Sequence, residues 1–139
     1  MLTSIRVSDL TSLGLVLIHQ GSHLDICVTP DIRSAFLTAA ANERASVLAT
    51  MQLLADQWPH VTLHTKQYRY EGAFPLGGNP PRDMKIYAFK GIQLRVYGAV
   101  LRIGTRDTWV GTALDIKKRN KADQQLLARA AKKLRDYHQ

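Results

Sequence analysis

The first half of the chain shows the spacing of a strand followed by two helices. Apolar and polar side chains alternate over residues 24–29, which is typical of a half-buried strand. After Pro30 the apolar residues recur at helical spacing, and Asn42 is a suitable N-cap for a second helix. We therefore expect a short helix and then a longer one. The second should end at Trp58-Pro59, because proline disfavours helical backbone in the residue before it.

The second half carries three β-rich runs, at residues 84–90, 92–103 and 108–118. The breaks between these runs are only a few residues long, so neighbouring runs should pair in antiparallel fashion. Residues 60–70 are compatible with a further strand, whereas the Gly- and Pro-rich stretch 72–83 predicts a loop.

The C-terminal residues predict an amphipathic helix. Asn120 can cap it, with Asp123 three residues further on as in a capping box, and an apolar stripe runs from Leu126 to Tyr137. The order of elements predicts an α+β domain, in which an antiparallel β-sheet carries an N-terminal helix pair and a C-terminal helix on one face. The other face would then be open to solvent or to a ligand.

The chain of 139 residues is expected to fold as one domain, 1–139, with an N-terminal extension, 1–23, whose structure the pattern does not define. The N-terminus lacks the charge pattern and the cleavage site of a signal peptide, and no apolar run approaches the roughly 20 residues that cross a membrane. Cys27 is the single cysteine, which excludes an internal disulfide and fits the reducing cytoplasm, where we expect the protein.

Positive charge is concentrated in the second half of the chain, whose net charge overall is +8. Residues 1–84 hold six Lys or Arg against seven Asp or Glu, whereas residues 85–139 hold thirteen against four. Such asymmetry favours a polyanionic partner, most often nucleic acid. A solubility surface, or a basic patch for an acidic protein partner, are the alternatives.

Three short motifs follow one another in this basic half: the aromatic strand IYAFKG, the arginine-bearing strand LRVYG, and a strand ending in KKRNK that leads into an alanine-rich basic helix. In this order they resemble the RelE/ParE/HigB superfamily of toxins from type II toxin–antitoxin systems, nearest its phage and HigB-like branch. Residues 84–137 carry the resemblance, and residues 24–58 match as a strand followed by helices. Residues 1–23 and 59–83 are not explained by it.

The resemblance implies a RelE-like fold and an mRNA interferase. Such an enzyme is an endoribonuclease that cleaves messenger RNA without metal or cofactor, typically on the ribosome. A cognate antitoxin, expected to be a small helix-turn-helix protein, would neutralise it. A gyrase-poisoning relative or a phage accessory protein would share the fold without the nuclease chemistry. A non-catalytic nucleic-acid- or protein-binding module is therefore the alternative.

Metal-free cleavage of RNA needs a base for the ribose 2′-OH, cations for the phosphorane and an acid for the 5′-oxygen. Arg95 alternates with Leu94 and Val96, so it should lie on the open sheet face as a phosphate clamp; the alternative is a surface arginine stacked on a tyrosine. The catalytic candidates are Arg95, Tyr97, Lys117, Lys118, Arg119, Lys121 and His138. Of these, His138 is supplied by the resemblance, and the lysine cluster could also be a solvated surface.

Further cations on the strands and the last helix are candidates for contact with the RNA backbone, although each alone is compatible with a plain surface residue: Lys85, Lys90, Arg102, Lys132 and Lys133. Four aromatic residues could stack on bases or pack in the core: Tyr87, Phe89, Tyr97 and Trp109. We favour the core for Phe89 and Trp109.

The histidine pairs His19/His23 and His60/His64 have metal-like spacing. Their neighbours do not favour a ligand-bearing helix, so no metal site is expected.

Overall fold

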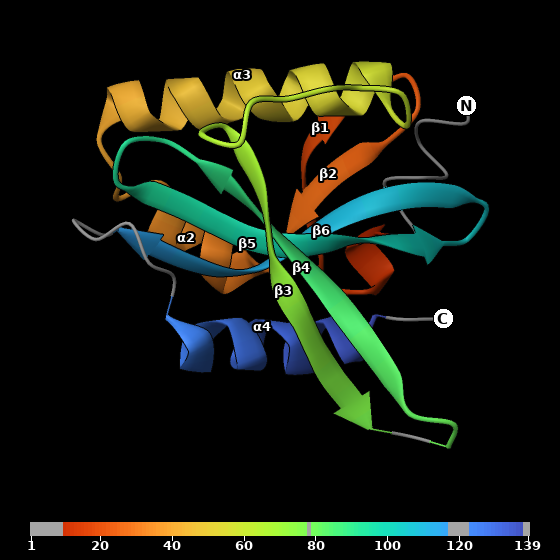
Figure 1. The fold of residues 1–139 in the computed structure, drawn as a ribbon. Coiled ribbons are helices and arrows are strands. Elements are labelled where there is room, and N and C mark those ends of the chain that lie inside the picture. Colours follow the sequence, from red (N-terminus) through yellow and green to blue (C-terminus); the bar gives the residue numbers. More distant parts are fainter. Residues whose placement is uncertain (1–9, 78, 117–122, 138–139) are drawn as a thin grey trace.

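A six-stranded sheet crosses the middle of the molecule, with helices on both of its faces (Figure 1). The computed structural model describes residues 10–77, 79–116 and 123–137. The strands are β1 (Val16–Gln20), β2 (Asp25–Val28), β3 (Tyr68–Gly77), β4 (Arg82–Lys90), β5 (Leu94–Ile103) and β6 (Arg106–Ile116). The helices are α2 (Pro30–Phe36), α3 (Ala41–Gln57) and α4 (Gln124–Arg135), after a helical turn at residues 10–12. None of the helices in these ranges has the length and apolar character that a membrane span requires.

The sheet is mixed, in the order β1-β2-β6-β5-β4-β3. β4, β5 and β6 pair with one another in antiparallel fashion, as their short connections predict. The prediction of a purely antiparallel sheet is nevertheless wrong, because β2 lies parallel to β6, with Cys27 opposite Val110. Parallel pairing requires a long connection between the two strands, and the segment from α2 to β5 provides it. The α+β class is confirmed.

Alternation along β5 separates two hydrophobic cores. Leu94 and Val96 pack beneath α2 and α3, whereas Tyr97, Ala99 and Leu101 point to the opposite face. On that opposite face they meet the apolar stripe of α4, which consists of Leu127, Ala130, Ala131 and Leu134. The prediction that all helices lie on one face is therefore wrong. An amphipathic helix must bury its stripe, and with α3 already on one face, α4 covers the face that was expected to be open.

Most of residues 72–83 lie in the two strands of a hairpin instead of the predicted loop. β3 runs to Gly77 and pairs in antiparallel fashion with β4, which begins at Arg82. Two shifts in register interrupt this pairing. Bulges of this kind, on a strand at the edge of the sheet, accommodate the glycine and proline residues that made the segment resemble a loop.

The starts of α3 and α4 differ from the predictions by two and three residues, respectively. α3 begins after Ala40 and not after Asn42. α4 begins after Asp123, whose Oδ1 accepts hydrogen bonds from two backbone N–H groups of the first turn, at 2.9 and 3.4 Å. Asp123, and not Asn120, is therefore the N-cap of this helix. The end of α3 at Trp58 is confirmed.

β4 and β5 stay together for only part of their length. Their ladder runs from the pair Lys90–Arg95 to the pair Tyr87–Gly98, and the β3–β4 hairpin then turns away from the β5–β6 hairpin (Figure 1). A bulge interrupts the β5–β6 ladder at Gly98, and bulges increase the local twist. Glycine permits the close approach here, because a Cβ atom would overlap the carbonyl oxygen of Val110. The result is a fork between two hairpins.

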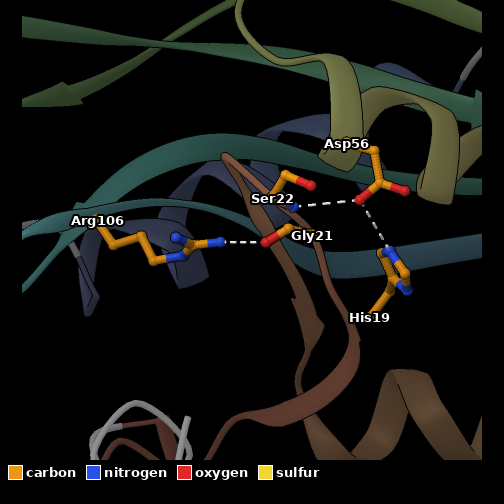
Figure 2. A network of polar contacts seen from close by, with 5 residues as sticks. All are labelled: His19, Gly21, Ser22, Asp56 and Arg106. Carbon is orange, nitrogen blue, oxygen red and sulfur yellow. Dashed lines mark hydrogen bonds and ion pairs between the residues drawn. The ribbon is translucent and has the colours of Figure 1, made fainter. Parts of the chain in front are cut away.

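The hairpin of β1 and β2 lies at one edge of the sheet and includes residues 16–20 of the segment 1–23. Figure 2 shows the polar contacts around its turn. Arg106 donates to the carbonyl oxygen of Gly21, and Asp56 Oδ1 accepts from the backbone N–H of Ser22 at 3.2 Å. The same oxygen lies 3.5 Å from His19 Nε2. These contacts join the turn to β6 and to the last turn of α3.

Candidate nucleic-acid interface

A hollow of about 360 Å³ lies at the end of the sheet where β4 turns into β5. Three of its lining side chains are positively charged, namely Lys66, Lys90 and Arg95, and we call it the cationic hollow. The other lining residues are Ser46, Gln67, Gly91 and Ile92, so no acidic side chain is among the described residues that line it. This composition favours an anionic ligand.

Arg95 lines the cationic hollow from the middle strand of the β4–β5–β6 antiparallel group. It faces Lys90 on β4 and Asp115 on β6, and directly opposed residues share one face of a sheet. The prediction that Arg95 lies on the face opposite Leu94 and Val96 is confirmed. The prediction that this face is open is wrong, since only 4% of Arg95 is exposed.

Tyr97, two residues along the same face, is fully buried in the core beneath α4. Its burial raises the pKa of the hydroxyl to about 12, an effect that the nearby Arg95 partly opposes. The ring of Tyr97 is therefore not accessible for stacking on a base, because α4 occupies the face on which we expected a ligand.

Lys90 is crowded by other cations. Burial lowers its pKa, and the adjacent Arg95 lowers it further, while Glu71 acts in the opposite direction. An anion in the cationic hollow would relieve the repulsion between Lys90 and Arg95. The electrostatics of the hollow thus favour a group such as phosphate.

The turn at the rim of the cationic hollow is anchored by Glu43 of α3. The carboxylate of Glu43 accepts hydrogen bonds from the backbone N–H groups of Ile92 at 2.6 Å, Gln93 at 2.7 Å and Leu94 at 2.9 Å. Burial alone would raise the pKa of this carboxyl, but the three hydrogen bonds together hold it below its ordinary value. Glu43 therefore fixes the β4–β5 turn against α3.

We expect Glu43→Gln to lower the free energy of unfolding by about 1–3 kcal/mol at pH 7, because an amide offers one acceptor oxygen where the turn presents three donors. A lowered pKa means that the stabilisation is fully present above the ordinary pKa of 4.5 and is lost as the pH falls through the folded-state pKa. Urea unfolding between pH 7 and pH 2 should show the difference between wild type and variant shrinking. A difference independent of pH would contradict this role, and the exposed Asp136→Asn serves as control.

A second hollow, of about 450 Å³, lies in the fork between the two hairpins, and we call it the aromatic hollow. It is lined by Trp58, Tyr68, Asp83, Met84, Lys85, Tyr87, Ala99, Val100, Leu101 and Arg102. The rings of Tyr68 and Tyr87 are stacked, with centroids 5.2 Å apart and planes 5° from parallel. The orientation of the Tyr68 ring is fixed by a hydrogen bond, which its hydroxyl accepts from Trp109 Nε1 at 3.2 Å. Burial raises the pKa of Tyr68, so the hydroxyl stays protonated.

Asp107 organises one side of the aromatic hollow. Its Oδ2 accepts a hydrogen bond from Trp58 Nε1 at 3.1 Å, and its Oδ1 accepts one from Arg102 Nη1 at 3.2 Å. A ring from the end of α3 and a guanidinium from β5 are thereby oriented by a single carboxylate.

The structure divides the predicted site residues among several places. Lys90 and Arg95 line the cationic hollow, whereas Lys85 and Arg102 line the aromatic hollow. Lys132 and Lys133 are exposed on α4 and line neither hollow. Five further candidates lie outside the described residues: Lys117, Lys118, Arg119, Lys121 and His138. Among the aromatic candidates, Phe89 and Trp109 are in the core, as favoured, and Tyr87 lines the aromatic hollow.

Sequence reasoning missed four residues that shape these hollows: Glu43, Trp58, Lys66 and Tyr68. One available signal was the YRY pattern at residues 68–70, whose spacing places two tyrosines on one face of a strand. Nothing near Glu43 in the sequence indicates the turn that it binds, because the two segments are about fifty residues apart.

In the part of the chain that the structure describes, no group of three or more His, Cys, Asp or Glu side chains is arranged to hold a metal ion.

Comparison of the chain with protein-family models, with curated proteins and with solved structures finds no match.

Proposed function

We propose that the protein is a toxin of the RelE/ParE/HigB type, an endoribonuclease that cleaves messenger RNA on the ribosome in the cytoplasm and is neutralised by a cognate antitoxin. The cationic hollow carries this proposal, because Lys90 and Arg95 bring two positive charges together at a site suited to a phosphodiester. The charge excess of residues 85–139 supports RNA as the ligand. The succession β2–α2–α3–β4–β5–β6–α4 also supports it, since the resemblance implies a strand and helices before three strands and a basic helix.

Cleavage would proceed by attack of the ribose 2′-oxygen on the adjacent phosphorus. The O2′–P bond forms and the P–O5′ bond breaks, which leaves a 2′,3′-cyclic phosphate and a 5′-hydroxyl. Arg95 would stabilise the phosphorane, and Lys90, with its lowered pKa, would accept the proton of the 2′-OH. The acid that protonates the leaving 5′-oxygen would come from His138 or from the Lys117–Lys121 cluster, and this assignment remains a prediction. The need for a 2′-OH restricts the substrate to RNA.

One observation favours a second candidate function. Arg95 is nearly enclosed and Tyr97 is fully buried, which leaves less room for a reacting group than an open concave face would. A non-catalytic module that binds nucleic acid or protein, such as a gyrase-poison-like toxin or a phage accessory protein, does not need that room.

Incubation of the purified protein with ribosomes and a defined message tests the proposal. We expect new 5′-hydroxyl ends in the message, mapped by primer extension, and growth arrest when the protein is expressed alone. An intact message in the presence of folded protein would remove the nuclease. RNA binding without cleavage would then select the second candidate.

A further inference from the structure

We propose that the aromatic hollow is a binding site for one nucleotide of single-stranded RNA, distinct from the cationic hollow. The inference rests on the proposed function for RNA as the ligand, but not for cleavage. A volume of about 450 Å³ falls within the range of small-molecule sites, roughly 300–1,000 Å³. The hollow lies where β4 and β5 have separated, so a planar group can enter between the hairpins without displacing a paired strand.

The aromatic side chains that line this hollow are of the type on which unpaired bases stack. Tyr87 is stacked on Tyr68 and is contacted by Tyr70, with ring centroids 5.3 Å apart, so it is held in place by aromatic neighbours. Trp58 is held by its hydrogen bond to Asp107. Rings fixed before binding lose little freedom when a base stacks on them, and stacking tolerates every base because each has a π face.

The charged groups of the hollow suit a sugar-phosphate. Lys85 and Arg102 come from the two different hairpins and supply a cation on each side of the fork. Arg102 uses Nη1 for Asp107, and a guanidinium has five N–H donors, so others are available for phosphate oxygens. Asp83 adds an acceptor of the kind that base amino groups satisfy. An acidic peptide would use the cations but not the stacked rings, and an apolar peptide would use the rings but not the cations.

A single strand of RNA can reach both hollows. Lys66 and Gln67 line the cationic hollow, and Tyr68, the next residue, lines the aromatic hollow. Along β4, Lys90 and Lys85 are five residues apart, which corresponds to roughly 17 Å of strand, and alternation directs them to opposite faces. An RNA that occupies both hollows must therefore pass from one face to the other near Gln67 and Tyr68. A nucleotide in the aromatic hollow would thus lie close, along the RNA, to a phosphate in the cationic hollow, and would influence which sequence is bound there.

Affinity for an uncleavable RNA tests the inference. The probe is a fluorescein-labelled oligoribonucleotide with 2′-O-methyl groups at every position, measured by fluorescence anisotropy. We expect Tyr87→Leu to weaken binding roughly 5- to 100-fold, because the side chain keeps its apolar bulk but loses its ring. Tyr87→Phe should bind like wild type. Arg129→Ala, which removes an exposed cation of α4, is the matched control for charge and should also bind like wild type.

A second measurement on the wild-type protein covers the case in which Tyr87→Leu fails to fold. Ultraviolet crosslinking of an oligoribonucleotide that contains 5-bromouridine should map to the peptides of Trp58 or Tyr87. Crosslinks confined to other segments would overturn the inference, and so would unchanged affinity in a folded Tyr87→Leu. Poly-glutamate that displaces the probe equally from the wild-type protein and from Tyr87→Leu would also overturn it. Crosslinking at Trp58 together with an intact message would overturn the nuclease proposal and leave this site standing.

Discussion

Replacement of Arg106 with alanine should lower the free energy of unfolding by about 3–5 kcal/mol. Asp25 is fully buried, and Arg106 Nε lies 3.1 Å from its Oδ2. The variant removes this cation and leaves a carboxylate in the interior, a change that costs far more than the loss of a surface pair. The turn between β1 and β2 also loses the donor that Arg106 presents to the carbonyl oxygen of Gly21 (Figure 2).

Thermal unfolding followed by circular dichroism measures this effect, and we expect Tm to fall by about 10 °C. Arg102→Ala is the matched control. Its partner Asp107 is at 3.2 Å, but the Arg102 side chain is 64% exposed, so its loss should change the stability by less than about 1 kcal/mol. The double variant Asp25→Asn, Arg106→Ala should recover part of the stability, because it no longer buries a charge. Equal losses in Arg106→Ala and Arg102→Ala would contradict the account.

How far the sequence predicts the sheet depends on how local each pairing is. β4, β5 and β6 are joined by short turns, so turn length and alternation are enough to place Arg95 on the face opposite Leu94. Alternation alone does not place Val110, which is an even number of residues from Leu114 but lies in the other core. Val110 packs beneath α4, because the bulge at Thr112 shifts the alternation between Val110 and the end of β6.

Pairings between distant segments were not predictable in the same way. Alternation in residues 24–29 identifies a strand but carries no information on its partner, β6. The apolar stripe of α4 shows that the helix is packed, but not on which face of the sheet. β3 was obscured by its own glycines and prolines, which an edge strand with bulges tolerates.

The candidate cations were recognisable by type, and their separation was already present in the spacing. Lys85 and Lys90 are an odd number of residues apart on one strand, as are Arg95 and Arg102, so alternation directs the members of each pair to opposite faces. The expectation of one shared RNA surface followed from the idea of an open face. What no pattern indicated was the fork, because it arises where two hairpins diverge after Gly98.

If the cationic hollow holds the phosphate that is cleaved, Arg95→Ala should reduce cleavage of a ribosome-bound message by roughly 100- to 1,000-fold. The expectation follows because Arg95 lines the cationic hollow opposite Lys90, and a guanidinium suits the geometry of a phosphate. Arg95→Lys keeps the charge but loses the planar fork of donors, and should retain an intermediate rate. Primer extension over a time course gives the rates, with Arg129→Ala as the control that should cleave like wild type.

The same variants distinguish the two candidate functions, because a nuclease and a binding module respond differently to the loss of one phosphate contact. In a nuclease, Arg95→Ala loses more cleavage than affinity, since the charge that Arg95 stabilises grows as the phosphorane forms. In a binding module, only affinity can fall, and the dependence of log K on log salt should lose about one unit of slope. Circular dichroism melting establishes that each variant is folded at the assay temperature, because Arg95 is largely enclosed. Wild-type rates from a folded Arg95→Ala would move the reaction away from the cationic hollow.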